Sequence, residues 1–443
     1  MGRLFGTDGV RGIAGRDLTA RLAMDLAVAA VPVLTTGDKP RPVAVIGRDS
    51  RASGDFLEAA VVAGLASSGV DVLRLGIIPT PGVAYLTQSL NADFGVVLSA
   101  SHNPAQDNGI KFFGRGGVKL PDETEDEIAA RLGSSEPHTE SFGRVTDAQP
   151  KQGLYLDHLL SSLSGAHPLK GMRVVVDCAH GAAYSIAPRA LRRAGAEVIT
   201  IGAAPDGDNI NSGCGSTALG ALQAAVVDNE ADAGLAFDGD ADRCLAVDAD
   251  GNPMDGDQIL TVLALDMKDE GLLDQQTVVV TVMSNLGFRT AMRESGISVV
   301  ETPVGDKHVY AAMRDGGYVL GGEQSGHIIQ MRYATTGDGL LTGLHLLAAV
   351  NRRGVPMSAA ATLMTRYPQV LVNVRGDKSR AMAAPALADA VIIAKEQLSD
   401  TGRVLLRPSG TEPAIRVMVE AADEGQAERV AAELANAVRA AMA

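Results

Sequence analysis

Short apolar runs alternate with amphipathic segments three times along the chain, each time in the order strand, helix, strand, helix, strand. Apolar runs of about four to eight residues are typical of buried strands, whereas apolar residues spaced by three and four are typical of helices. The pattern predicts three similar α/β domains with mixed, largely parallel sheets. The predicted segments are 42–46, 54–67, 70–75, 81–90 and 94–98, then 173–176, 184–194, 197–201, 216–229 and 234–237, then 277–283, 285–295, 298–301, 306–315 and 318–320.

The pattern changes near the C-terminus. Beyond residue 366, three strands at 369–374, 403–406 and 414–419 and a long Ala-rich helix at 423–442 show no βαβ alternation, which predicts a smaller α+β domain. A polar stretch at 134–146 and a turn at 250–253 separate the earlier repeats, and Asp255 or Asp257 can cap the helix that follows that turn. We therefore expect four domains, at 1–150, 151–253, 254–366 and 367–443.

Composition excludes several classes of protein. Apolar residues make up 46% and charged residues 21% of the 443 residues, as in ordinary globular domains. Aromatic residues are only 3%, and the net charge of −14 repels a phosphate backbone or an anionic lipid surface, so we expect no nucleic acid and no membrane partner. Three widely spaced cysteines and no apolar segment long enough to cross a bilayer indicate a cytoplasmic protein.

The third predicted strand of every repeat runs into a polar turn, at 99–104, 238–243 and 322–327. Ligands gather at the carboxyl ends of parallel strands, so the three turns are expected to share one site rather than to form three independent solvated loops. Ser101 stands beside His102, but adjacent residues leaving a strand point apart, and no G-x-S-x-G motif is present, which argues against a hydrolase triad. Taken alone, Ser101 and Asn103 could equally organise a simple Asn-Pro turn.

Three aspartates, Asp238, Asp240 and Asp242, occupy every second position of the second turn. They can face one point and offer hard oxygen ligands to Mg²⁺ or Ca²⁺. An EF-hand is excluded because Arg243 stands where that loop needs Gly and Ala249 where it needs Glu, and the lack of thiolate or imidazole in the turn disfavours zinc. The alternative is three unpaired carboxylates in a solvated turn, which would repel one another.

The C-terminal domain carries a second candidate anion site in the loop at 407–413, followed by Arg416. Arginine forks, hydroxyl groups and a glycine that exposes backbone N–H groups together suit phosphate, although a plain hairpin loop is the alternative. Isolated basic residues in Gly-rich contexts are, taken alone, more typical of surface than of a site; these are Arg11, Lys111, Lys307 and His308.

Taken together, the motifs resemble those of the α-D-phosphohexomutase family along essentially the whole chain and in family order. They are the segment at 5–12 (Phe-Gly-Thr-Asp-Gly-Val-Arg-Gly), the serine turn, the aspartate turn, the turn at 322–327 (Gly-Glu-Gln-Ser-Gly-His) and the loop at 407–413 (Arg-Pro-Ser-Gly-Thr-Glu-Pro). The resemblance implies four domains around a central cleft, a covalent phosphate on Ser101, and one Mg²⁺ per chain held by phosphorylated Ser101 and the three aspartates. It further implies catalytic roles for Ser101, His102, Lys111, Arg243, Arg11 and His308, and substrate contacts by Glu323, Ser325, His327, Arg407, Ser409, Gly410, Thr411 and Arg416.

The reaction that the resemblance implies is interconversion of glucosamine 6-phosphate and glucosamine 1-phosphate through a bisphosphate intermediate, feeding UDP-N-acetylglucosamine and cell-wall precursor synthesis. One departure concerns Lys307-His308, where the glucosamine branch commonly has Arg-Tyr; the histidine is similar to the glucose and mannose branch. A phosphomannomutase or phosphoglucomutase activity, or a catalytically silent phosphosugar-binding module, are therefore the alternatives. The sequence is compatible with a homodimer.

Overall fold

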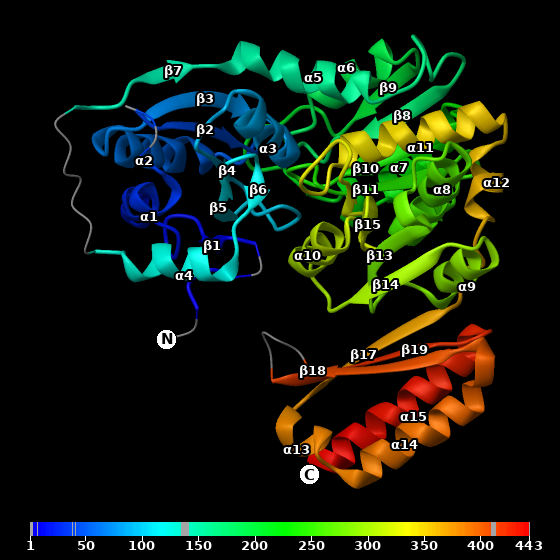
Figure 1. Cartoon of the computed structure of the whole chain (residues 1–443). Coiled ribbons are helices and arrows are strands. Elements are labelled where there is room, and N and C mark those ends of the chain that lie inside the picture. Colours follow the sequence, from blue (N-terminus) through cyan, green and yellow to red (C-terminus); the bar gives the residue numbers. More distant parts are fainter. Residues whose placement is uncertain are drawn as a thin grey trace. The chain divides into compact units, whose positions relative to one another are not determined.

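The computed structural model describes residues 3–6, 8–37, 39, 41–133, 141–408 and 413–442 (Figure 1). Contacts divide the chain into two compact units, one formed by Met1–Met283 with Ile297–Leu363 and the other by Ser284–Gly296 with Met364–Ala443. No helix within the described ranges combines the length and the apolarity that a bilayer crossing requires.

The first sheet of the larger unit has the strand order β1-β5-β4-β2-β3-β7, with β6 paired to β5. Successive residues of a strand face opposite sides, and Ala44 and Ile46 of β2 join the apolar core formed with α1 and α2, whereas Val45 joins the core formed with α3. The elements are β1 (Val10–Ile13), α1 (Ala20–Leu34), β2 (Val43–Arg48), α2 (Gly54–Ser67), β3 (Asp71–Ile77), α3 (Thr80–Ser89), β4 (Phe94–Leu98), β5 (Asp107–Gly114), β6 (Val118–Lys119), α4 (Asp122–Ala130) and β7 (Val145–Asp147).

The second and third sheets have the orders β12-β11-β10-β8-β9 and β14-β13-β15-β16. Asp255 is the N-cap of α8, where it forms a capping box with Gln258, so the first of the two predicted caps is the correct one. The elements are α5 (Gln152–Ser161), β8 (Arg173–Asp177), α6 (Ile186–Arg193), β9 (Glu197–Ile201), α7 (Gly220–Asp228), β10 (Ala233–Phe237), β11 (Cys244–Asp248), β12 (Pro253–Met254), α8 (Gly256–Asp269), β13 (Thr277–Thr281), β14 (Ser298–Thr302), α10 (Asp306–Gly316), β15 (Leu320–Gly322), β16 (Ile328–Gln330), α11 (Gly339–Arg353) and α12 (Met357–Ala361).

All three sheets share one topology. The first strand of each repeat (β2, β8, β13) lies between the second and the third, both parallel to it, and an antiparallel fourth strand (β5, β11, β16) pairs with the third. Each polar turn predicted from the sequence is therefore the connection between a third strand and its antiparallel neighbour. The same topology places the three turns at equivalent positions of their sheets.

The smaller unit contains a three-stranded antiparallel sheet of order β17-β19-β18 with its own apolar core. The predicted fold class, three similar α/β domains followed by a smaller C-terminal α+β domain, is confirmed. The boundaries near residues 150, 253 and 366 stay a prediction. The elements of this unit are α9 (Leu286–Glu294), β17 (Gln369–Arg375), α13 (Lys378–Met382), α14 (Pro385–Leu398), β18 (Arg403–Pro408), β19 (Ala414–Glu420) and α15 (Glu424–Met442).

Candidate active site

Ser101 lies in the turn after β4 and is buried at 1% exposure. Its φ of 54° is in the left-handed region, which a residue with a side chain adopts at a cost of about 1–2 kcal/mol. The Ser101 hydroxyl donates to Oδ2 of Asp238 at 2.5 Å, and Nδ1 of His102 is 3.3 Å from the Ser101 hydroxyl oxygen. The turn therefore aims the serine oxygen at the aspartate turn of the second sheet.

A fully buried arginine, Arg51, holds the serine turn in this conformation. Its guanidinium forms an ion pair with buried Asp49 at 2.9 Å. It also donates to four backbone carbonyls, those of residues 101, 103 and 104 in the serine turn and that of residue 107 at the start of β5. Asp49 accepts a hydrogen bond from Ser99 at 2.6 Å, and the Ser99 hydroxyl in turn accepts from the backbone N–H of Ser101 at 2.9 Å. These hydrogen bonds satisfy the carbonyls of residues 101, 103, 104 and 107 and the backbone N–H of Ser101, and so fix the backbone on which the Ser101 side chain is held.

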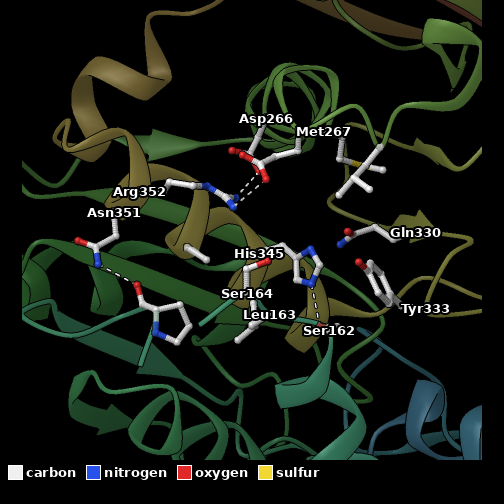
Figure 2. Close-up of a pocket in the computed structure, with 14 residues that line it drawn as sticks. Ser162, Leu163, Ser164, Asp266, Met267, Gln330, Tyr333, His345, Asn351 and Arg352 are labelled. Atoms are coloured by element: carbon white, nitrogen blue, oxygen red, sulfur yellow. Dashed lines mark hydrogen bonds and ion pairs between the residues drawn. The ribbon is translucent and has the colours of Figure 1, made fainter. Parts of the chain in front are cut away.

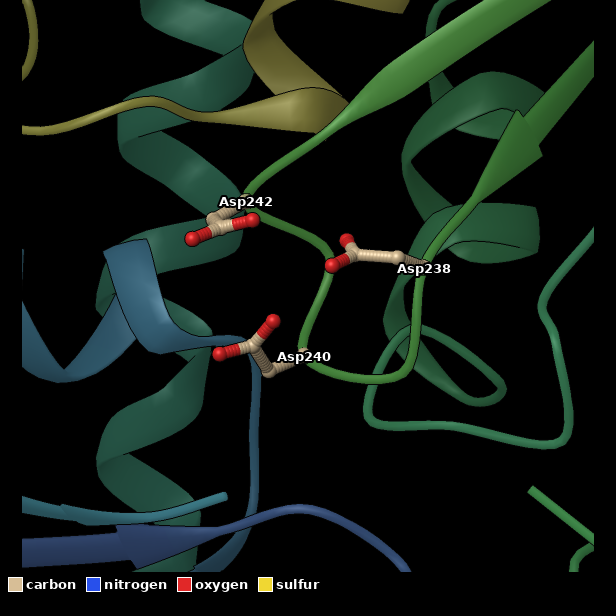
Figure 3. Close-up of side chains that lie close together, drawn as sticks. All are labelled: Asp238, Asp240 and Asp242. Carbon is tan, nitrogen blue, oxygen red and sulfur yellow. The ribbon is translucent and has the colours of Figure 1, made fainter. Parts of the chain in front are cut away.

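The carboxylates of Asp238, Asp240 and Asp242 converge on one point, with one ligand oxygen of each lying within 4.8 Å of the others (Figure 3). All three are buried, and one oxygen of Asp240 and one of Asp242 have no hydrogen-bond partner among the described residues. Burial and the two neighbouring carboxylates raise the pKa of Asp238 well above its ordinary value. Unpaired buried carboxylate oxygens fit a hard divalent cation such as Mg²⁺, and the absence of thiolates among them disfavours zinc.

The aspartate turn and the serine turn touch through their backbones at Gly239. A Cβ added there would lie 2.6 Å from the carbonyl oxygen of Ser101, closer than real side chains approach. Asn211 donates to the same carbonyl oxygen at 2.9 Å. On the other side, Thr80 at the start of α3 donates through its hydroxyl to Asp240 at 2.7 Å. Glycine at position 239 is therefore required for the approach of the two turns.

Two lysines of the first domain, Lys111 and Lys119, form ion pairs at and beside the carboxylates. Lys111 on β5 is 4% exposed and lies 2.8 Å from Asp240 and 2.6 Å from Asp8. Burial alone would lower the pKa of Lys111, but the charges of Asp240 and Asp8 raise it above its ordinary value, so the ammonium stays charged. Lys119 pairs with Asp8 at 3.2 Å and with Asp306, the first residue of α10. Lys111 is therefore a residue of this cluster, not a surface lysine.

The third turn supplies Glu323, Ser325 and His327. Nδ1 of His327 is 3.5 Å from Asp242, and the backbone N–H of Gly337 donates to its Nε2 at 3.1 Å, which leaves the ring proton on Nδ1. His327 also forms an isolated β-bridge with Arg243, which joins the second turn to the third. The Ser325 hydroxyl is buried with no hydrogen-bond partner in the described ranges. The structure thus brings all three predicted turns together.

Three further predicted residues lie at the margin of this cluster. Arg11 on β1 pairs with Asp8. His102 is half-buried, and burial together with the charges of Arg243 and Arg11 lowers its pKa, so the ring is neutral at neutral pH. His308 is exposed in the first turn of α10; its backbone N–H donates to the carbonyl of Gly305 at 3.0 Å, and its imidazole makes no hydrogen bond to another described residue. Its neighbour Lys307 is engaged instead, pairing with Asp122 at 2.8 Å and Glu125 at 2.9 Å.

In the smaller unit, Arg407 on β18 and Arg416 on β19 are direct partners across the strand pair. Burial and the neighbouring charge of Arg416 lower the pKa of Arg407. The Nε atom of each arginine is buried without a partner in the part of the chain that the structure describes. Two adjacent like charges with unused donors fit an anion such as phosphate. The other predicted residues of this loop, Ser409, Gly410 and Thr411, lie outside the described residues.

Some residues that build the cluster were not predicted from the sequence. Asp49 and Arg51 follow β2, the first strand of the first repeat, and the predicted functional turns all follow third strands. Asp8, Lys119 and Asp306 form a partly buried charge network between the first and third domains. Lone charged residues give no sequence signal of such pairing. The one sequence signal for Asp49 and Arg51 is the polar turn Arg-Asp-Ser-Arg at 48–51, where β2 ends.

Comparisons with known proteins cover the chain almost completely. It matches the four phosphoglucomutase/phosphomannomutase domain families in order: alpha/beta/alpha domain I at residues 2–138, domain II at 154–251, domain III at 255–367 and the C-terminal domain at 371–437. A phosphoglucosamine mutase of Thermobifida fusca is 63% identical over 444 residues, covering 99% of this chain and 98% of the relative. A phosphoglucosamine mutase of Streptomyces griseus is 59% identical and covered completely, as is this chain.

Solved structures share the fold. A phosphoglucomutase/phosphomannomutase family protein of Burkholderia thailandensis superposes with a TM-score of 0.83 at 24% identity, covering 98% of this chain and 97% of that one. An N-acetylphosphoglucosamine mutase of Aspergillus fumigatus, solved with GlcNAc-6P and magnesium, has a TM-score of 0.69 at 19% identity, covering 99% and 96%. The sequence relatives and the four matched domains together show that this chain belongs to the phosphoglucomutase/phosphomannomutase family, the α-D-phosphohexomutases.

Proposed function

We propose that this chain interconverts glucosamine 6-phosphate and glucosamine 1-phosphate, with Ser101 as the residue that carries the transferred phosphoryl group. The observation that carries the proposal is the 2.5 Å contact between the Ser101 hydroxyl and Asp238 inside a buried three-carboxylate cluster. Relatives that are 57% to 63% identical over almost the whole chain are named phosphoglucosamine mutase, which supports the choice of sugar. No triad of a hydrolase is formed around Ser101 in the described part of the chain.

Asp238, Asp240, Asp242 and the oxygen of Ser101 are the groups that would hold one Mg²⁺. When bound, the cation neutralises the negative charge of the phosphoryl oxygens, the main demand of phosphoryl transfer. Lys111, held in its charged form by Asp240 and Asp8, and Arg243, whose Nε lies 3.9 Å from Asp242 and has no hydrogen-bond partner among the described residues, add positive charge beside the carboxylates. The serine turn positions the oxygen of Ser101, because Arg51 and Asp49 fix the backbone of that turn.

The proposed reaction consists of two phosphoryl transfers. In the first, the bond between phosphorus and the Ser101 oxygen breaks while a bond to the free sugar hydroxyl forms, and the hydroxyl proton leaves to a base. In the second, after the bisphosphate has turned around, its other phosphate returns to Ser101 and the sugar oxygen recovers a proton. Glu323 and Ser325, with the unpaired Ser325 hydroxyl, are the proposed contacts to sugar hydroxyls, and His327 orders the same turn. We also propose catalytic roles for His102, Arg11 and His308.

The smaller unit is proposed to bind the phosphate that does not react. Arg407 and Arg416 offer unused guanidinium donors, and Ser409, Gly410 and Thr411 are proposed to complete that site. We also propose the four domains as bounded above, a cytoplasmic location and phosphosugars with their bisphosphate as the ligands.

The experiment that tests the function combines peptide mass mapping with turnover measurements. Purified protein is expected to carry one phosphate on the peptide that contains Ser101, and Ser101→Ala should abolish turnover of glucosamine 6-phosphate. The control is Ser67→Ala at the end of α2, which should leave both readouts unchanged. Phosphate elsewhere with an active Ser101→Ala protein would refute the mechanism, and phosphosugar binding without turnover by the wild type would indicate a silent binding module.

The sugar preference requires a separate measurement, kcat/KM for the glucosamine, glucose and mannose phosphates side by side. Glu323 provides a carboxylate near the sugar, which favours an ammonium substituent. A single polar contact discriminates by only about 1–3 kcal/mol, so weaker activity on glucose phosphates is expected. Equal or greater values for glucose or mannose would place this chain in the other branch, as His308 suggests, and leave the transfer mechanism intact.

A further inference from the structure

A cavity of about 290 Å³ lies in the larger unit between the segment that follows α5, helix α8, strand β16 and helix α11 (Figure 2). None of the residues proposed above for catalysis or sugar binding lines it. Its apolar wall is formed by residues such as Leu163, Met267 and Ala348. One of its polar side chains, Gln330, is buried without a hydrogen-bond partner among the described residues.

Gln330, the last residue of β16, is the most informative of these groups. Its side chain is 1% exposed, yet neither its amide nitrogen nor its amide oxygen has a hydrogen-bond partner among the described residues. Figure 2 shows the amide pointing across the cavity toward the ring of His345. A buried amide without partners is costly, so a donor and an acceptor aimed into a cavity indicate a ligand with the complementary pair.

His345 on α11 supplies an acceptor in the same cavity. The Ser162 hydroxyl donates to the carbonyl of Leu159 at 2.7 Å, so it accepts from Nε2–H of His345, which lies 2.8 Å away. The proton on Nε2 leaves Nδ1 as an unprotonated acceptor, and no described residue donates to it. Burial and the charge of Arg352 lower the pKa of His345 to about 4, in agreement with a neutral ring.

The charged residues of the cavity disfavour anions. Arg352 lies 2.7 Å from Asp266 and 3.7 Å from Glu270, so two carboxylates face one guanidinium. The amide of Asn351 is already used, donating to the carbonyl of Pro168 at 2.8 Å (Figure 2). A phosphosugar would meet net negative charge here, and the cavity is therefore not a second copy of the substrate site.

From these contacts we propose that the cavity binds a small, uncharged, planar lactam, a ring that carries adjacent C=O and N–H groups. The adjacent donor and acceptor of the Gln330 amide match the C=O and N–H of a lactam in one plane. A second ring N–H can donate to Nδ1 of His345, and the faces of the ring pack against Leu163, Met267 and Ala348. The volume of about 290 Å³ lies just below the usual range of ligand pockets, about 300–1,000 Å³, and therefore suits a small ligand of one or two fused rings.

The test is calorimetric titration of the full-length protein with uracil, which carries this edge and a second N–H. We expect saturable binding at one site per chain. The matched ligand, 1,3-dimethyluracil, has no N–H group, so it should bind at least about tenfold more weakly, since loss of one hydrogen bond to a buried group corresponds to about that factor.

Two variants assign the site. Gln330→Leu should weaken uracil binding by at least about tenfold and leave the denaturation midpoint equal or higher, because it removes two unpaired buried polar atoms. Gln397→Leu, an exposed position on α14 in the smaller unit, is the control and should bind as the wild type does. A lower midpoint of Gln330→Leu would show that the amide has a structural role. Unchanged uracil binding by a folded Gln330→Leu protein, equal binding of the dimethylated ligand, or no uracil binding to the wild type would each overturn the proposal.

Discussion

Replacement of Arg51 by methionine tests whether the buried clamp beneath Ser101 positions the serine. The substitution removes the guanidinium and keeps a long apolar side chain, so the loss is mainly of charge and hydrogen bonds. Four backbone carbonyls, three in the serine turn and one at the start of β5, and the carboxylate of Asp49 would lose this partner. Removal of one member of a buried ion pair costs about 3–5 kcal/mol of stability, and we expect that loss here.

The effect on catalysis follows from the conformation of Ser101. Its left-handed φ of 54° costs about 1–2 kcal/mol, a strain that the clamp holds in place. Without Arg51 the turn gains that energy by relaxing, and the hydroxyl leaves its position 2.5 Å from Asp238. A displacement of about 1 Å at a reacting group costs roughly a hundredfold in rate, so kcat should fall by about that factor or more.

The assays are urea denaturation for stability and steady-state turnover for kcat. Arg21→Met, whose exposed pair with Asp25 is worth about 0.3–0.5 kcal/mol, serves as the control for loss of an arginine. In the double variant Asp49→Asn with Arg51→Met, part of the stability should return, because no charge is left buried without a partner, whereas turnover should stay low. An Arg51→Met protein with the stability and turnover of the wild type would refute the positioning role.

Three other substitutions address the rest of the site. Asp240→Asn removes one carboxylate of the proposed cation site and should lower kcat with the fold retained; turnover by the wild type that persists in excess chelator would contradict a cation requirement. Arg407→Ala should weaken phosphosugar binding about ten- to a hundredfold while Ser101 can still be phosphorylated, and normal binding would exclude this loop as the phosphate site. Gly239→Ala would place a Cβ 2.6 Å from the Ser101 carbonyl oxygen and should reduce both stability and kcat, whereas Gly220→Ala, with nothing within 4 Å of the added atom, should change neither.

Elements with a strong local pattern were predicted from the sequence with small errors at their ends. The predicted strand 94–98 and helix 54–67 coincide with β4 and α2, because both have clear apolar spacing and defined ends. The antiparallel fourth strands were not predicted. β16 has only three residues, and β5 begins with polar residues directly after a functional turn, so neither shows the period of a strand. Their pairing depends on contacts with the third strand, which local pattern does not encode.

The residues of the candidate site likewise fall into those that the sequence predicts and those that it does not. Residues whose chemistry is repeated locally, as in the three aspartates, could be predicted because a short turn forces like charges together and so requires a cation. Arg51 could not, because an isolated arginine is far more often exposed than buried, and its partners are carbonyls up to 56 residues away in the chain. A residue whose partners are backbone carbonyls has no matching side chain in the sequence, so the pattern of side chains does not predict its role.

The repeated topology explains why three separate turns can share one site. In each domain the turn joins a parallel third strand to an antiparallel neighbour, so its backbone is anchored at both ends by strand pairing and its side chains can diverge in chemistry. The second turn touches the first through Ser101 and Asp238 and the third through Arg243 and His327. A short connection of this kind can change from serine to aspartate to glutamate without altering the sheet. The three α/β domains therefore repeat one scaffold, and the division of chemical roles among them lies in the turns.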